Sequence, residues 1–212
     1  QNLDKNGIIA ESYTESSDFV GVETCSYIQY AAFWGSIECF KFLYADQTVK
    51  KTKHLFRYAV AGGNLEIIRL CDQLPNVKYK YSREIAIAFH QWDVFEWLCE
   101  NKFDLSHHSQ EEQNLINHCI LYSNFTSFAY LSRFEFNFNS ALQFAIRFDC
   151  LLLTKWLLRH RSQFYKESDS DSEEGIYLYH ACRNGNKEIL LLLLNDNNYN
   201  NWEILPEQLP PQ

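Results

Sequence analysis

The sequence predicts an all-α protein built from about six helix-turn-helix repeats that stack into a solenoid. The stretch Tyr30–Leu43 has small residues before Gly35 and apolar residues at helical spacing after it, which is typical of two short helices joined at a glycine. Similar stretches recur along the chain. One such helix pair cannot bury its own apolar face, so the copies supply the surfaces that each pair needs.

The copies align on the residue at the turn between the two helices. These turn residues are Gly35, Gly63, His90, Ser123, Asp149 and Gly185. The intervals between them are 28, 27, 33, 26 and 36 residues. We expect a left-handed backbone at each turn, because glycine is best suited to that conformation and Asp and His are among the tolerated substitutes. Ser is the least suitable of the residues at these positions.

Two further positions recur in the same register. An acidic residue stands three positions after the turn in four copies, where it meets the positive end of the second helix dipole. The residue eight positions after the turn is Leu or Cys in every copy, and we expect it in the core. This register predicts repeats over residues 25–44, 55–71, 82–100, 115–131, 141–159 and 176–194.

The order of residue types in each copy resembles the ankyrin repeat. The pattern is an apolar residue, a small pair, two variable positions, Gly, and a second helix with an acid, two apolar residues and Leu. Ala59–Arg69 and Ala181–Leu191 carry it most clearly, and Ser140–Ala145 is similar to a degenerate form of the family's opening Thr-Pro-Leu-His segment. The resemblance covers roughly residues 25–195, and the aromatic-rich copies resemble divergent ankyrin-type repeats of some unicellular eukaryotes.

Several features depart from the family pattern. The family's Pro is missing in every copy, Gln29 and Gln143 stand where it has His, and Arg83 occupies an apolar position. We therefore expect weaker hydrogen bonds between neighbouring repeats, with aromatic packing as compensation. The alternative is another solenoid of helix pairs, with a period of roughly 34 residues or more.

The chain order predicts three parts: an N-terminal tail or cap (1–24), the repeat domain (25–195) and a C-terminal tail (196–212). An acidic insertion at 163–175 lengthens the last interval between turns. The loop after the first repeat holds Lys50, Lys51 and Lys53. It is interpreted either as a solvated loop or as a basic finger that steers an acidic partner.

Composition bounds the possible functions. The net charge of −8 argues against a nucleic-acid partner, which requires a basic face. No run of 18 apolar residues is present, so we expect no membrane insertion. Seven cysteines without close pairs indicate free thiols in a reducing compartment, hence a cytoplasmic protein. Cys119 and Cys182 take the positions of Ala31 and Ala32, which places both in the predicted core.

The search for catalytic motifs gives little. The sequence has no Gly-rich phosphate loop and no nucleophile elbow, so we expect no enzymatic activity and no cofactor. His107, His108, His118 and Cys119 lack the short, fixed spacing of zinc ligands, so we also expect no metal site.

The two positions before each turn are variable and partly exposed in ankyrin-type stacks, and here they are rich in aromatic residues and Arg. Such residues dominate the energetics of protein interfaces. The candidate partner-binding residues are Phe33, Trp34, Phe89, Tyr122, Arg147, Phe148 and Arg183. The alternative is that the aromatic rings pack between successive repeats and that the Arg side chains are merely solvated.

The resemblance and these residues together predict a non-enzymatic module that binds another protein through the concave face and finger loops of the solenoid. The chain would act as a monomer or as a subunit of a hetero-complex. Two alternatives stay open: a structural component of a large assembly held by its tails, and the targeting or regulatory domain of a longer enzyme.

Overall fold

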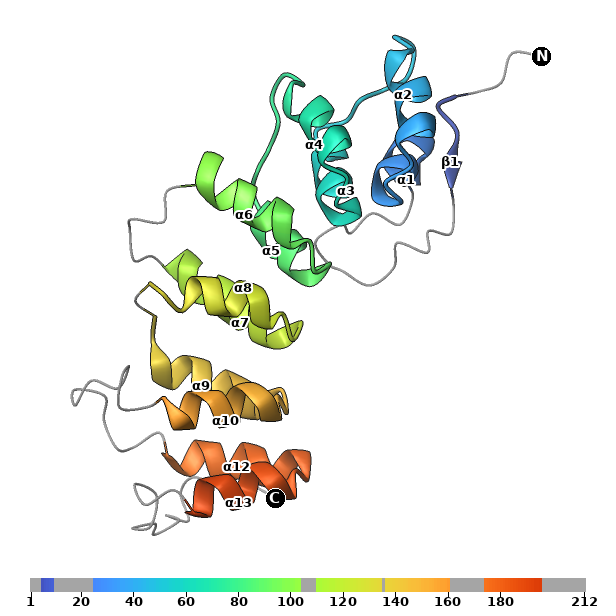
Figure 1. Ribbon diagram of the computed structural model, residues 1–212. Helices are drawn as coiled ribbons and strands as arrows, with labels where there is room; N and C mark the ends of the chain where they lie inside the picture. The colour runs from blue at the N-terminus through green and yellow to red at the C-terminus, as the bar shows by residue number, and fades with distance from the viewer. Residues whose placement is uncertain (1–4, 10–24, 104–109, 135, 161–173, 196–212) are drawn as a thin grey trace. The chain divides into compact units, whose positions relative to one another are not determined.

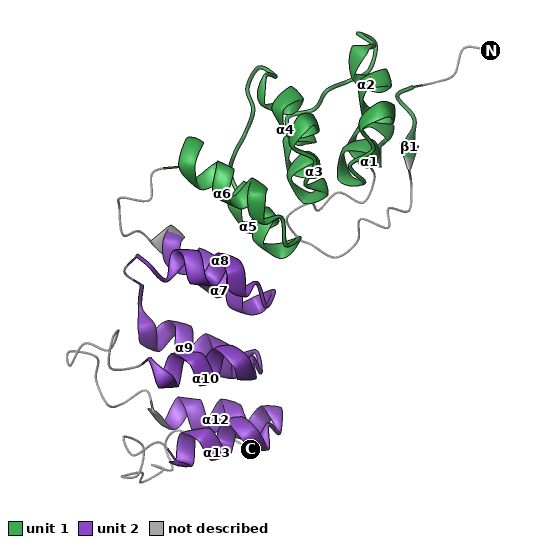
Figure 2. Ribbon diagram, viewed as in Figure 1, with its two compact units in different colours: residues 1–107 green, residues 108–212 purple. Residues whose placement is uncertain are grey.

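The computed structural model describes residues 5–9, 25–103, 110–134, 136–160 and 174–195. The predicted C-terminal tail and most of the predicted N-terminal tail and acidic insertion lie outside these ranges. The chain forms two compact units, residues 1–107 (unit 1) and residues 108–212 (unit 2), shown in Figure 2. The described residues form twelve helices and one pair of two-residue strands. The predicted all-α, helical-repeat architecture is therefore confirmed.

Unit 1 contains three helix pairs (Figure 1). They are α1 (Tyr27–Phe33) with α2 (Ile37–Ala45), α3 (Leu55–Gly62) with α4 (Leu65–Asp72), and α5 (Ser82–Ala88) with α6 (Trp92–Asn101). The first helices of successive pairs pack on one another, α1 on α3 and α3 on α5. Strands β1 (Ile8–Ile9) and β2 (Cys25–Ser26) pair antiparallel just before α1.

Unit 2 repeats this arrangement with three further pairs. They are α7 (Gln110–Leu121) with α8 (Phe125–Leu131), α9 (Phe138–Arg147) with α10 (Leu151–Arg159), and α12 (Glu174–Asn184) with α13 (Lys187–Asn195). Helix α9 packs against both α7 and α12. Each of the six pairs thus coincides with one predicted repeat.

All six predicted turn residues have a left-handed backbone, with φ between 52° and 72°. At five of these turns the amide of the following residue donates to the carbonyl five positions earlier, as in a Schellman motif. The Ser36 amide donates to Ala31 at 2.9 Å, and the Gln91 amide donates to Ala86 at 2.8 Å. The turn chemistry therefore fixes where each first helix ends, even at the unfavourable Ser123.

A stability prediction follows for the non-glycine turns. His90 has φ 55°, where a side chain costs about 1 kcal/mol relative to glycine. We expect His90→Gly to raise the free energy of unfolding by about 0.5 kcal/mol once the extra chain entropy of glycine is counted. The matched control is Glu96→Gly within α6, which should lower it by about 1 kcal/mol. Urea denaturation measures both values, and destabilisation by His90→Gly would contradict the assigned turn.

The residue after the turn joins neighbouring repeats, which the sequence analysis did not anticipate. The Asn64 side chain caps α4 by accepting from the Glu66 and Ile67 amides, and it donates to the Gly35 carbonyl of the preceding turn at 3.2 Å. The Gln91 side chain donates in the same way to the Ala61 carbonyl at 3.0 Å. These bonds tie neighbouring repeats together.

The core follows the predicted register. The residue eight positions after each turn is at most 9% exposed: Leu43, Cys71, Leu98, Leu131, Leu157 and Leu193. Arg83, which breaks the apolar pattern, is nevertheless buried, and its guanidinium carbon lies 4.1 Å from the Phe103 ring centroid. A cation–π contact thus accommodates the charge.

One residue that was predicted to lie in the core is exposed instead. Cys119 is buried, as expected, but Cys182 is exposed. Cys182 lies on α12, in the last helix pair that the structure describes, and no further described pair covers that side of α12. The equivalent Ala32 is buried because α1 packs against the next first helix, α3.

Candidate functional site

Three of the predicted partner-binding residues form an aromatic cluster in unit 1. The Phe33 ring contacts Trp34 and Phe89 edge to face, each at a centroid distance of 5.5 Å. Tyr30 adds an edge contact to Trp34 at 6.1 Å. Trp34 is nevertheless 57% exposed, whereas Phe33 and Phe89 are half-buried. We call these four residues the aromatic cluster.

Gly62 allows the aromatic cluster to form. A Cβ atom at Gly62 would lie 2.7 Å from the Phe33 carbonyl oxygen and would meet the Ala32 carbonyl oxygen more closely still. Only a glycine therefore permits this approach of α3 to α1. Because the second repeat has no side chain here, Phe33 of the first repeat can reach Phe89 of the third. The cluster thus joins alternate repeats across Gly62.

Trp34 also lines an apolar hollow of about 400 Å³ at the end of unit 1. Its other walls are Tyr27, Tyr30, Ala31, Ser36, Cys39 and Leu43. Trp34 and this apolar hollow together form an exposed apolar patch, and such patches can mark interaction sites.

The remaining candidates, Tyr122, Arg147, Phe148 and Arg183, lie in unit 2. Tyr122 stacks on His118 at 6.2 Å. Phe148 is 42% exposed and contacts Phe144 at 4.6 Å, while the guanidinium carbon of Arg147 lies 5.7 Å from its ring. The predicted partner-binding residues are therefore divided between the two units.

Arg147 and Arg183 converge on one histidine in unit 2. Burial is the first cause that lowers the pKa of His180, and the charges of Arg147 and Arg183 lower it further. The Asn184 side chain donates to the Arg147 carbonyl at 3.0 Å and so ties the last two repeats together. Both Arg side chains are exposed, and neither forms an ion pair with a described residue.

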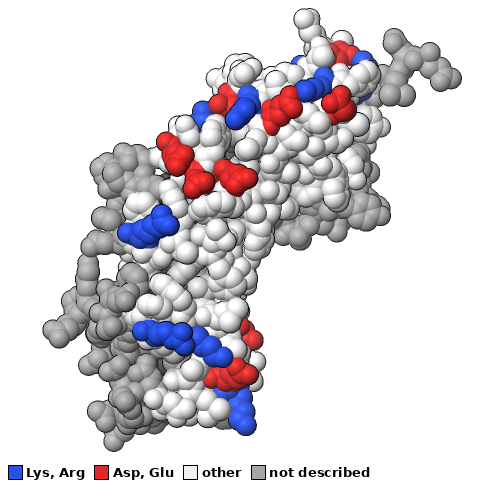
Figure 3. Space-filling model, in the orientation of Figure 1, with Lys and Arg blue, Asp and Glu red and all other residues white. Residues whose placement is uncertain are grey.

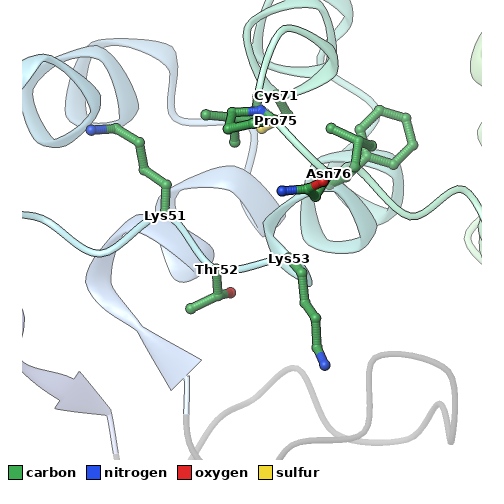
Figure 4. Close-up of a pocket in the computed structure, with 9 residues that line it drawn as sticks. Lys51, Thr52, Lys53, Cys71, Pro75 and Asn76 are labelled. Atoms are coloured by element: carbon green, nitrogen blue, oxygen red, sulfur yellow. The ribbon is translucent and has the colours of Figure 1, made fainter.

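A second cavity, which the sequence analysis did not identify, lies between two finger loops of unit 1. It has a volume of about 420 Å³. It is lined by Lys51, Thr52, Lys53, Phe56, Cys71, Leu74, Pro75, Asn76 and Val77. Figure 4 shows Lys51, Thr52 and Lys53 along one segment, across from Pro75 and Asn76. The side chains of Lys51 and Lys53 extend in different directions, and the Lys51 amine donates to the Asp46 carbonyl at 3.2 Å.

Two of the buried thiols are poor nucleophiles at neutral pH because they are protonated. Burial raises the pKa of Cys71 to about 12 and that of Cys25 to about 11, so both stay protonated. Within the described ranges no three His, Cys, Asp or Glu residues group closely enough to hold a metal ion. His107 and His108 lie outside the described residues.

Elsewhere on unit 1, charges of both signs are interspersed, as the face in Figure 3 shows. Several are paired: Lys41 with Glu66 at 2.7 Å and Lys102 with Asp72 at 2.9 Å. None of the helices that the structure describes is long and apolar enough to cross a membrane.

Comparison with known proteins gives one match. The model of a family described as a domain of unknown function, DUF3447, matches residues 47–131, less than half of the chain. The matched segment runs from the finger after the first repeat to the end of α8. No curated protein and no solved structure gives a significant match.

Proposed function

We propose that this chain is a non-enzymatic module that binds another protein through the turn ends of its first helices and through its finger loops. The exposure of Trp34 carries the proposal. Phe33 and Phe89 have a packing role, because each contacts an aromatic ring in the cluster and is half-buried. Trp34 leaves more than half of its surface in solvent beside an apolar hollow.

The energetics of burying an aromatic side chain favour a binding role for the Trp34 ring. A tryptophan that moves from solvent into an interface removes a large apolar area from water, and such residues are over-represented among binding hot spots. Its neighbours Tyr30 and Phe33 limit the ring's freedom before binding, which lowers the entropic cost of ordering it. Trp34 would therefore act as a partly preorganised anchor.

Affinity capture from the cells that make this protein, read by mass spectrometry, tests the proposal. The bait proteins are the wild type, Trp34→Ala and the control Leu152→Ala, which removes a 65% exposed side chain from α10. Circular dichroism verifies that all three fold. We expect a protein that the wild type and Leu152→Ala retain and Trp34→Ala loses. Identical sets for all three baits would contradict the proposal.

We also infer that the repeats are of the ankyrin type and that the protein works inside the cell. The inference is supported by the quoted motifs, by the left-handed residue at every turn and by the free thiols along the described chain. The Gln29 side chain, which stands where the ankyrin pattern has His, donates to the hydroxyl of Thr52, in the loop before the next repeat, at 3.2 Å. An experimental structure that shows a different repeat geometry would overturn the ankyrin assignment.

A further inference from the structure

The cavity between the fingers of unit 1 has walls that are held in place. We call residues 46–54 finger 1 and residues 73–81 finger 2. In finger 1, the Asp46 carboxylate accepts from Lys5 at 2.7 Å, and the Lys50 amide donates to the Asn6 side chain at 3.0 Å. These bonds connect the finger to the segment that contains β1. The finger therefore does not depend on a ligand for its position.

Finger 2 is held in place by hydrogen bonds to the Asp72 carboxylate. The Tyr79 hydroxyl donates to the Asp72 carboxylate at 2.6 Å, and Lys102 donates to the same carboxylate at 3.0 Å. The Tyr79 ring also contacts Phe56, which lines the cavity, at 5.2 Å. Preorganised walls reduce the entropic cost of binding.

The fingers are basic in an acidic protein. Finger 1 contains three lysines and one acid, and finger 2 contains two lysines and no acid, so together they carry a net charge of +4. The whole chain carries −8. The one acid, Asp46, is already occupied by Lys5. The fingers are therefore locally positive although the chain as a whole is acidic.

Lys53 of finger 1 and Lys78 of finger 2 both lower the pKa of one residue, His54. After burial, the charges of Arg57, Lys53 and Lys78 lower the pKa of His54, which lies at the end of finger 1. Both lysines are exposed, and neither forms an ion pair with a described residue. Lys53 lines the cavity and Lys78 directly follows Val77, which also lines it, so both exposed lysines lie at the edge of the cavity.

The cavity interior has the opposite character. Phe56, Leu74, Pro75 and Val77 give it an apolar lining, and burial keeps the Cys71 thiol neutral. A ligand that satisfies both features has an apolar group for the cavity and negative charge on each side of that group. An uncharged hydrophobic ligand would not interact with the lysine charges. A purely acidic ligand would not fill the apolar cavity.

We propose that fingers 1 and 2 bind an acidic peptide segment of a partner protein, with one large apolar side chain of that segment in the finger cavity. This proposal rests on the proposed function of the chain as a protein-binding module. It concerns a different surface from the aromatic cluster, so the two can be tested separately.

Fluorescence anisotropy with the full chain and a labelled synthetic peptide tests the proposal. The probe is a short peptide of alternating Asp and Glu with one central Leu. One matched probe has Ala in place of Leu, and another has Asn and Gln in place of the acids. We expect the Leu-containing acidic probe to bind more tightly than both, and its affinity to fall as added salt screens the exposed charges. No binding, or equal binding of all three probes, would overturn the proposal.

Matched variants locate the binding. Lys53→Gln with Lys78→Gln should weaken binding by about fivefold, because two exposed charge pairs are lost. Arg159→Gln with Lys187→Gln removes the same charge from exposed positions in unit 2 and should leave the affinity unchanged. Val77→Phe narrows the cavity and should abolish the preference for Leu over Ala. Equal weakening by the two double variants would overturn the assignment to the fingers.

The same titration separates the two proposals. Trp34→Ala should bind the acidic probe as the wild type does, because Trp34 does not line the finger cavity. If the probe fails while Trp34→Ala still loses a captured partner, the finger proposal falls and the proposed function stands. If the probe binds as expected while no captured protein depends on Trp34, the finger proposal stands and the aromatic cluster loses its assigned role.

Discussion

Gly62→Ala is expected to lower the free energy of unfolding by about 3 kcal/mol. Gly62 lies at the end of α3, where alanine has the better helix propensity by about 1 kcal/mol, so local preference alone predicts stabilisation. The added Cβ would instead meet the carbonyl oxygens of Ala32 and Phe33. These are backbone atoms of the first repeat, so only a separation of α1 from α3 can relieve the clash. Urea denaturation followed by circular dichroism measures the change.

Gly185→Ala is the matched control for this prediction. Gly185 has φ 69°, and a Cβ atom there would meet no atom within 4 Å. The substitution therefore carries only the backbone cost of a left-handed alanine, about 1 kcal/mol. If Gly62→Ala proves neutral or stabilising, the close approach of α1 and α3 is wrong.

Trp34→Ala is expected to weaken binding to the captured partner by about 30-fold or more, which corresponds to about 2 kcal/mol. The reason is that the ring offers the largest exposed aromatic surface of the cluster and lies beside an apolar hollow. Its stability cost should be smaller, about 1 kcal/mol, because the ring makes only edge contacts with Tyr30 and Phe33. Isothermal titration with the purified partner measures the affinity.

Two control variants, one for affinity and one for stability, are compared with Trp34→Ala. Leu152→Ala should leave the affinity unchanged, because Leu152 is exposed on the second helix of its pair, α10, whereas the proposed binding surface uses the ends of the first helices. Phe40→Ala should cost about 4 kcal/mol of stability, because Phe40 is fully buried. A stability loss for Trp34→Ala as large as that for Phe40→Ala would show that Trp34 is a packing residue.

The sequence was sufficient to predict the repeats and their turns. The spacing of small and apolar residues around Gly35 and Gly63 is a local signal, and left-handed backbone restricts which residues a turn accepts. That restriction located the turns at His90 and Asp149 without a glycine. The burial eight positions after each turn follows from the same register.

The sequence alone could not show that Phe33 is half-buried while its neighbour Trp34 is exposed. Both stand before the same turn, and both are aromatic. Phe33 is drawn into packing by Gly62 and Phe89, which belong to two other repeats. Trp34 meets no such neighbour in the described part of the next repeat, because Gly62 has no side chain. Only the three-dimensional arrangement shows which ring stays in solvent.

The finger cavity and the exposed Cys182 are two further features that could not be predicted from the sequence. The cavity forms between loops that are separated along the chain, so neither loop alone indicates it, although Lys50, Lys51 and Lys53 did mark finger 1 as basic. Cys182 was assigned to the core from its equivalence to Ala32. That equivalence fails in the last described helix pair, because burial at this position requires a following pair.

Hydrogen–deuterium exchange of the chain with and without its captured partner tests the central claim most directly. If the turn ends of the first helices bind the partner, protection should appear in peptides that contain Tyr30–Ser36 and Phe89–Gln91, and it should be lost with Trp34→Ala. Protection confined to residues 1–22 and 195–212 would contradict the account and favour a chain held by its tails.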